Sequence, residues 1–250
     1  MDTSERQTET CPSHGAYESV LLSAKLKNRS KCPRCTQDHS EHAEALLVQE
    51  ELDRAAARIL ARLEAIGVPS RFHDATFDGF IAKDEQQRRA LDWAKGQVKN
   101  FAAIRKAGTS TLLLGLPGTG KTHLACAVAI AIAEQGFVTR YSTVMRMIRR
   151  IKDSWRRESE ESETAAIAFF AKPDLLVLDE VGVQQGSQFE SNLLFDILND
   201  RYERTHPTII VSNLSIAEVS VALGERLIDR LREGGGKMIS FEWPSHRRAT

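Results

Sequence analysis

The sequence predicts an α/β domain built around a parallel sheet. Three apolar runs, at residues 112–114, 175–178 and 209–211, are separated by longer segments with helical patterning, and the first run leads directly into a glycine-rich loop. Runs that are continuously apolar, rather than alternating, are typical of strands covered by helices on both faces. We therefore expect a three-layer αβα fold in which strands and helices alternate.

The composition is that of a globular protein. Its 250 residues are enough for one α/β domain with a smaller appendage, and 42% of them are hydrophobic. Because 34 basic residues balance 34 acidic ones, any binding of nucleic acid must come from a local patch. The longest apolar stretch, 124–133, is too short to span a membrane, and the first residues lack an apolar leader. We expect a cytoplasmic chain without membrane contact, in which the four cysteines indicate metal rather than disulfides.

Residues 1–41 predict a zinc-binding module. They contain two pairs of ligands, and the two residues between the members of each pair give the spacing of tetrahedral Zn²⁺ sites. The four ligands are Cys11, His14, Cys32 and Cys35. His39 and His42 are possible substitutes for the histidine, and free thiols are the alternative interpretation. A segment this small needs a metal to fold, and a closed site leaves no position for catalysis, so docking is its expected role.

Residues 42–67 predict a long amphipathic helix that ends at Gly67. Its apolar residues, at near-helical spacing, are Leu46, Leu47, Leu52, Ile59, Leu60, Leu63 and Ile66. Packing on the chain's own domain and docking to a partner explain such a helix equally well. The α/β domain then occupies residues 68–250, beginning with a linker that contains three phenylalanines and a helix over 84–107.

Residues 115–122, GLPGTGKT, match the phosphate-loop pattern G-x-x-x-x-G-K-[ST] at every fixed position. The glycines let backbone N–H groups turn inward around a polyphosphate, and the following helix adds the positive end of its dipole. Lys121 would reach the β- and γ-phosphates, and Thr122 would hold Mg²⁺. The residues expected to bind the nucleotide here are Gly115, Pro117, Gly118, Thr119, Gly120, Lys121 and Thr122. We expect the linker with three phenylalanines to cover the edge of this site.

Two later strands end in polar residues. Asp179 and Glu180 follow the run at 175–178, at the edge of a parallel sheet where ligands bind. Asp179 can hold Mg²⁺, and Glu180 can polarise the water that attacks the γ-phosphate. Asn213, after the last apolar run, could contact the γ-phosphate or that water, and a simple turn residue is the alternative.

A basic helix is predicted over 144–157, after a short strand at 136–141. Its apolar residues are Met147, Ile148, Ile151 and Trp155. Its candidate contacts to the phosphate backbone of DNA are Arg146, Arg149, Arg150, Arg156 and Arg157. A solvated basic face explains these arginines equally well, and backbone contacts would give affinity without sequence specificity.

Five segments together resemble the DnaC-type helicase loaders of the AAA+ superfamily, with the IstB transposition helper ATPases as near relatives. The segments are GLPGTGKTHLA, DLLVLDEVG, LFDILNDRYE, PTIIVSNL and LGERLIDRL. The resemblance covers residues 68–248 and implies an AAA+ domain that lacks the common C-terminal helical lid. The metal-binding N-terminus resembles the extensions of phage-borne and prophage-borne loaders.

The resemblance also implies roles for individual residues. Asn213 corresponds to the sensor 1 residue, and Arg226 and Arg230 to the box VII arginines, with Arg230 as the finger inserted into a neighbouring subunit's site. Arg247 corresponds to sensor 2, acting on the nucleotide of its own subunit, with Arg248 beside it as the alternative. No arginine in the phosphate loop or its helix can neutralise the charge that develops on the γ-phosphate. An arginine from a neighbouring subunit is the plausible source of that positive charge, so we expect hydrolysis to require assembly.

The function implied by the resemblance is delivery of a replicative, hexameric helicase of the DnaB type onto single-stranded DNA. The chain would be an ATPase that is weak alone, with ATP, Mg²⁺ and Zn²⁺ as its cofactors and ATP acting as an assembly and release switch. It would self-associate into an ATP-dependent oligomer or spiral, and residues 42–67 would be the candidate helicase-docking helix. An IstB-like ATPase that binds duplex target DNA is the nearest alternative, and a small-molecule kinase is the third.

Overall fold

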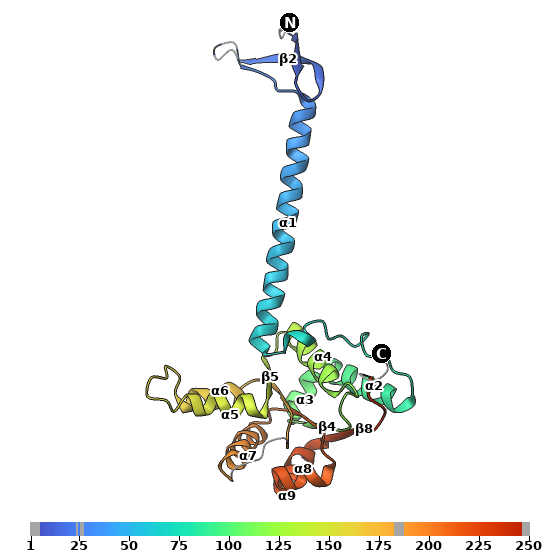
Figure 1. Ribbon diagram of the computed structural model, residues 1–250, viewed down its shortest axis with the longest axis vertical. Helices are drawn as coiled ribbons and strands as arrows, with labels where there is room; N and C mark the ends of the chain where they lie inside the picture. Colours follow the sequence, from blue (N-terminus) through green and yellow to red (C-terminus); the bar gives the residue numbers. More distant parts are fainter. Residues whose placement is uncertain (1–5, 24, 26–27, 183–187, 247–250) are drawn as a thin grey trace. The chain divides into compact units, whose positions relative to one another are not determined.

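The computed structural model in Figure 1 contains two compact units, which divide between Leu60 and Ala61. The residues that it describes are 6–23, 25, 28–182 and 188–246. None of the described helices combines the length and the hydropathy that a membrane span requires.

A small antiparallel sheet begins the N-terminal unit. Its strands are β1 (Arg6–Cys11), β2 (Gly15–Ser23) and β3 (Asn28–Arg29), in the order β1-β2-β3. Gly15 closes the turn between β1 and β2 with a φ of +77°, a conformation that favours glycine. In the described part of this unit the buried apolar side chains are Cys11 and Cys32, so hydrophobic packing contributes little to its stability.

Helix α1 (Pro33–Ile66) has 34 residues and begins before the helix predicted at 42–67. Proline is favourable at its first position, where the missing N–H would have had no partner within the helix. This early start places Cys32 just before α1 and Cys35 in its first turn. Of the residues in α1, Leu63 and Ile66 are buried, whereas the preceding turns are exposed.

Five parallel strands form the sheet of the C-terminal unit, in the order β5-β6-β7-β4-β8. The strands are β4 (Thr111–Gly115), β5 (Thr139–Thr143), β6 (Leu175–Asp179), β7 (Thr208–Ser212) and β8 (Lys237–Phe241). Successive residues alternate between two cores, because Leu113 and Val177 belong to one and Leu112 and Leu176 to the other. Both faces of the sheet are therefore buried, which explains the continuous apolar runs in the sequence.

Helices cover both faces of this sheet. One core contains residues of α2 (Glu85–Lys99), α3 (Phe101–Ala107) and α4 (Lys121–Glu134). The other contains residues of α5 (Val144–Asp153), α6 (Glu163–Ala171), α7 (Gln188–Glu203), α8 (Ile216–Leu223) and α9 (Glu225–Arg232). Two 3₁₀ turns are η1 (Ser70–Phe72) and η2 (Glu233–Gly235). The predicted three-layer αβα fold is confirmed.

Several element boundaries differ from the prediction. The single helix predicted over 84–107 is two helices, because the side chain of Asn100 ends α2 by donating to a carbonyl of its last turn. Helix α5 ends four residues early, and Trp155 packs instead on the ring of Phe189, with 5.2 Å between the ring centroids. The strand predicted at 136–141 lies slightly later, as β5. The N-terminal hairpin, α6, α8 and β8 were not predicted.

Candidate nucleotide and metal sites

The phosphate loop connects β4 to α4 and is held by contacts from residues far along the chain. The backbone of Gly115 passes so close to β8 that a Cβ there would lie 2.4 Å from the carbonyl oxygen of Phe241. Trp243 donates its indole N–H to the carbonyl oxygen of Thr119 at 3.0 Å. Glycine is therefore required at Gly115 for close packing, in addition to its positive φ of 123°.

Lys121 and Thr122 lie at the start of α4. The ammonium of Lys121 is inside the loop, where it donates to the carbonyl oxygens of Gly115 and Leu116, each at 2.7 Å. The hydroxyl of Thr122 donates to a carboxylate oxygen of Asp179 at 2.8 Å, which links α4 to the end of β6. The ammonium of Lys121 can thus bind phosphate oxygens. Beside it lie the hydroxyl of Thr122 and the carboxylate of Asp179, which are oxygen ligands that fit Mg²⁺.

The acidic residues of the site lie at the end of β6. One oxygen of Asp179 accepts from the hydroxyl of Tyr141 at 2.7 Å, and the other accepts from the backbone N–H of Glu180 at 2.7 Å. Burial, followed by the charge of Asp179, raises the pKa of Tyr141, which keeps this hydroxyl a neutral donor. Glu180 has a φ of +60°, which is uncommon for a non-glycine residue and marks a sharp turn at the end of the strand.

These residues line one cavity of about 470 Å³ at the C-terminal edge of the sheet. The predicted site residues that line it include Pro117, Gly118, Gly120, Lys121, Thr122, Asp179, Glu180 and Asn213. The linker after α1 supplies Arg71, Phe72, Gly79, Phe80 and Ile81. The ring of Phe80 also lies against Gly120, where a Cβ would approach it to 2.6 Å. A cationic end and an apolar, aromatic wall suit a nucleoside triphosphate.

The cavity residues that the sequence did not single out include Arg71, His123 and His246. Arg71 brings a cation to the site from the linker, outside the phosphate loop and its helix. The backbone N–H of His246 donates to the carbonyl oxygen of Gly118 at 2.9 Å, and its buried Nε2 has no hydrogen-bond partner among the described residues. Tertiary packing brings these residues to the cavity, and no local pattern marks them.

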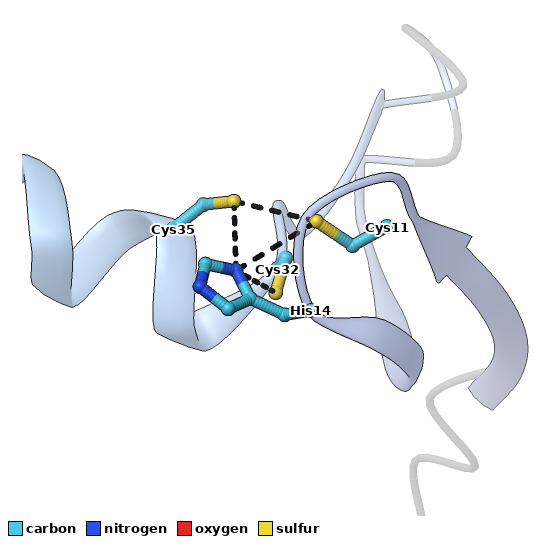
Figure 2. A group of neighbouring side chains, drawn as sticks. All are labelled: Cys11, His14, Cys32 and Cys35. Carbon is cyan, nitrogen blue, oxygen red and sulfur yellow. Dashed lines mark hydrogen bonds between the residues drawn. The ribbon is translucent and has the colours of Figure 1, made fainter.

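Four potential metal ligands converge in the N-terminal unit (Figure 2). They are Cys11, His14, Cys32 and Cys35, and one ligand atom from each lies within 4.8 Å of the others. The Nδ1 atom of His14 is 3.8, 3.9 and 3.3 Å from the three sulfur atoms, in chain order. A tetrahedral site with Zn–S of ~2.3 Å and Zn–N of ~2.0 Å has edges of about 3.5 to 3.8 Å. The four atoms are therefore spaced to surround one ion.

The surroundings of the cluster orient its histidine and favour the thiolate form of Cys11. The Nε2 atom of His14 lies 3.1 Å from a carboxylate oxygen of Asp38, a contact that orients the ring and leaves Nδ1 facing the sulfur atoms. The backbone N–H of Ser13, together with contacts to Cys35 and His14, lowers the pKa of the Cys11 thiol to about 6. The hydrogen bond to Cys11 raises the pKa of the Cys35 thiol to about 11, so Cys11 is the first of this pair to become a thiolate. Three thiols and one oriented imidazole are a donor set that fits Zn²⁺.

Comparison with known protein families agrees with the nucleotide site. The profile of the family described as IstB-like ATP binding protein matches residues 20–233. The chain belongs to this family.

Relatives of this IstB-like protein include replication proteins. DnaC of Escherichia coli (strain K12), a replicative helicase loader, is 30% identical over 197 residues, which cover 79% of this chain and 79% of DnaC. YdaV of the same strain is 27% identical over 249 residues, which cover 98% of this chain and 93% of YdaV. The crystal structure of the DnaC helicase loader matches with a TM-score of 0.62 and 27% identity, over 70% of this chain and 100% of that structure. The protein is therefore a DnaC-type, ATP-binding protein with the AAA+ fold.

The two residues that the resemblance suggests as box VII arginines, Arg226 and Arg230, lie on α9. Within the described part of the chain, neither Arg226 nor Arg230 lines the nucleotide cavity. The guanidinium of Arg230 lies over the ring of Tyr202, 5.2 Å from its centroid. Arg247, the expected sensor 2 residue, and Arg248 beside it lie outside the described residues.

The basic face expected to contact DNA is divided by the early end of α5. Arg150 lies between the ring of Phe169, 3.6 Å from its centroid, and the carboxylate of Glu161 at 2.7 Å. The exposed arginines of this segment are Arg146, Arg149, Arg156 and Arg157. The last two follow the end of α5, so the five arginines do not form one helical stripe.

Proposed function

We propose that this protein loads a replicative, hexameric helicase of the DnaB type onto single-stranded DNA, with ATP acting as a switch between assembly and release. The observation that carries the proposal is the identity of 30% over 197 residues to a replicative helicase loader. The cavity at the phosphate loop supports it, because its lining suits a nucleoside triphosphate. The proposal places the protein in the cytoplasm.

In the proposed ATP site, Lys121 binds the β- and γ-phosphates within a cradle formed by residues 115–120. Thr122 and Asp179 would hold Mg²⁺, which neutralises charge on the phosphate oxygens when it is bound. Glu180 polarises the attacking water, and Asn213 orients that water or the γ-phosphate. The exposure of both side chains at the cavity supports these two roles.

The charge that stabilises the transition state is proposed to come from a neighbouring subunit of an ATP-dependent oligomer. Arg230 is the proposed finger, with Arg226 beside it, and such a residue can raise the rate by ~10³ to 10⁵. The position of both arginines away from the cavity of their own chain supports this arrangement. Arg71 is the competing source of charge within the same subunit, and Arg247 is the proposed sensor 2. The isolated chain should therefore hydrolyse ATP weakly.

The N-terminal part is proposed to dock on the helicase. We assign residues 1–41 to a zinc-binding module, 42–67 to a docking helix and 68–250 to the AAA+ domain. When bound to its four ligands, Zn²⁺ would cross-link the hairpin to the start of α1 and so stabilise a unit with few buried apolar residues. The exposed apolar side chains of α1 are available to a partner and support the docking role.

A loading assay with the full-length protein tests the proposal. A DnaB-type helicase, a single-stranded DNA circle coated with single-strand-binding protein, and an annealed oligonucleotide to be displaced are the required components. We expect displacement to depend on this protein and on ATP, and the Lys121→Ala protein to fail because it cannot bind nucleotide. Displacement that is equally fast without the protein, or failure of the protein to co-purify with the helicase, would show that it is not a loader.

An IstB-like role in transposition is the second candidate, favoured by the description of the family profile. It predicts tighter binding to duplex DNA than to a single strand of the same length. Competition between the two oligonucleotides at one salt concentration separates the candidates, because phosphate contacts make affinity depend on salt. A preference for duplex DNA, together with no binding to the helicase, would favour the transposition role.

A further inference from the structure

Arg230 is half-exposed and packs on an aromatic ring. Its guanidinium lies over the ring of Tyr202, on α7, 5.2 Å from the ring centroid. No carboxylate is paired with it among the described residues. Arg204, two residues after Tyr202, does have such a partner, because it pairs with Asp200 at 2.7 Å.

A ring face and a carboxylate hold a guanidinium in different ways. A carboxylate accepts hydrogen bonds from the guanidinium and so occupies its donors. The face of an aromatic ring attracts the cation without accepting conventional hydrogen bonds from its five N–H groups. Arg230 is therefore positioned while its donors stay available to an anion outside its own chain.

The ring of Tyr202 is itself fixed from the other side. Its hydroxyl donates to a carboxylate oxygen of Glu233, in η2 directly after α9. This hydrogen bond is the largest cause of the raised pKa of Tyr202. Tyr202 thus connects the end of α7 to the segment that carries Arg230.

We propose that Tyr202 is a positioning residue that holds Arg230 ready for the phosphate of a nucleotide bound to a neighbouring subunit, and that Glu233 fixes the ring of Tyr202. This inference rests on the proposed role of Arg230. Tyr202 does not touch the nucleotide, and it acts through the order that it imposes on the arginine side chain. Its contribution is to the rate of hydrolysis in the assembly and not to the binding of ATP.

Substitutions at Tyr202 test the inference in the full-length protein under assembling conditions. Tyr202→Leu removes the ring face, and we expect it to lower kcat roughly 2- to 5-fold, the range of an exposed cation–π contact. Tyr202→Phe keeps the ring and loses the bond to Glu233, so its kcat should lie between those of Tyr202→Leu and the wild type. The KM for ATP, the Kd of a fluorescent ATP analogue and the thermal midpoint should stay close to the wild-type values in both variants.

A double-mutant cycle separates positioning from a structural role. In single-turnover assays on the Arg230→Ala background, Tyr202→Leu should cause no further loss, because the side chain that it positions is absent. An equal loss on both backgrounds, or an unchanged kcat for Tyr202→Leu while Arg230→Ala is inactive, overturns the inference alone. Full activity of Arg230→Ala would instead overturn the proposed finger, and the role of Tyr202 with it.

Discussion

At the scale of single residues, His14 determines whether the N-terminal cluster can hold a metal. Its Nδ1 atom faces three sulfur atoms, while its Nε2 atom contacts Asp38. His39 and His42, the alternatives suggested by the sequence, are not part of the cluster. The contact with Asp38 sets the orientation of the ring, and a ring oriented in this way costs less entropy to bind an ion.

We predict about one zinc ion per chain, held by this cluster. His14→Ala should lose the ion, whereas His39→Ala, its matched control, should keep it. Asp38→Ala should keep the ion but lower the affinity about 10- to 100-fold, because the ring loses its orienting partner. Elemental analysis of freshly purified protein, followed by competition with a chelator, measures all three. Zinc retained by His14→Ala, or lost by His39→Ala, would contradict the assignment.

Arg149 and Arg150 are adjacent in the sequence but differ in their surroundings. Arg150 is engaged by Phe169 and Glu161, whereas Arg149 is exposed without a charged partner among the described residues. If α5 contacts the phosphate backbone, Arg149→Ala should lower the salt slope of single-strand binding by roughly 0.7, and Arg150→Ala should change it less. Fluorescence anisotropy at several salt concentrations measures the slope. Equal slopes for wild type and Arg149→Ala would make this arginine a solvated residue.

How far the sequence predicts the site depends on the distance between its parts along the chain. Lys121, Thr122 and Asp179 were found because a local pattern fixes their positions relative to the strand ends. Arg71, Tyr141 and His246 were missed because they reach the site only through the order of the strands and the path of the linker. Such contacts are tertiary, so a single sequence carries no local signal for them.

At the scale of elements, α1 has an apolar stripe that is buried near the C-terminal end of the helix and exposed in the preceding turns. Leu63 and Ile66 are buried in the C-terminal unit, while Leu52 and Ile59 are 59% and 60% exposed. These four residues recur at helical spacing and therefore share one face. A stripe left exposed over several turns is a candidate contact surface.

We predict that Leu52→Ser weakens helicase binding and leaves the fold intact. The exposed leucine contributes little to folding, so the free energy of unfolding should change by no more than about 0.5 kcal/mol. Leu46→Ser is the matched control, because Leu46 is 53% exposed but lies about 120° away around the helix. Co-purification with the helicase compares the binding of the two variants, and urea denaturation compares their free energies of unfolding. Equal binding by both variants would indicate that the stripe is not the docking surface.

The elements that escaped prediction are those with weak local signals. Strand β8, with the sequence KMISF, lies at the edge of the sheet and has three exposed residues among its five, so it lacks the apolar run of the central strands. Helix α6 begins in an acidic segment, where Ser162 caps it by accepting from the backbone N–H of Ala165. The buried central strands and α4 were predicted because burial on both faces leaves a strong pattern.

At the scale of the whole molecule, α9 contributes none of the described residues that line the nucleotide cavity of its own chain. Arg226 and Arg230 both lie outside the cavity, whereas Arg71 lines it. Arg71 from the same chain and Arg230 from a neighbour are thus two candidate sources of the arginine charge. Charge from a neighbour predicts that mixing two inactive variants restores some ATPase activity, whereas charge from the same chain predicts that it does not.

We predict that Arg230→Ala binds ATP almost normally but loses hydrolysis, and that Glu180→Gln subunits mixed with it restore part of the activity. Some interfaces then join an intact finger to an intact water-polarising residue. The ATPase rate across mixing ratios is the measurement, and each variant must first be shown to assemble with wild-type chains. If no ratio restores activity while Arg71→Ala alone abolishes it, the charge comes from the same subunit.

The position of β8 has a consequence for the folding of the nascent chain. Strand β4 pairs with β8, and Gly115 and Thr119 are packed against Phe241 and Trp243, which are made more than a hundred residues later. At about 5 to 20 residues per second, translation leaves the phosphate loop without this support for on the order of ten seconds. A nascent chain in which Phe241 and Trp243 have not yet been made therefore lacks these contacts to its phosphate loop, and we expect ATP binding to wait for their synthesis.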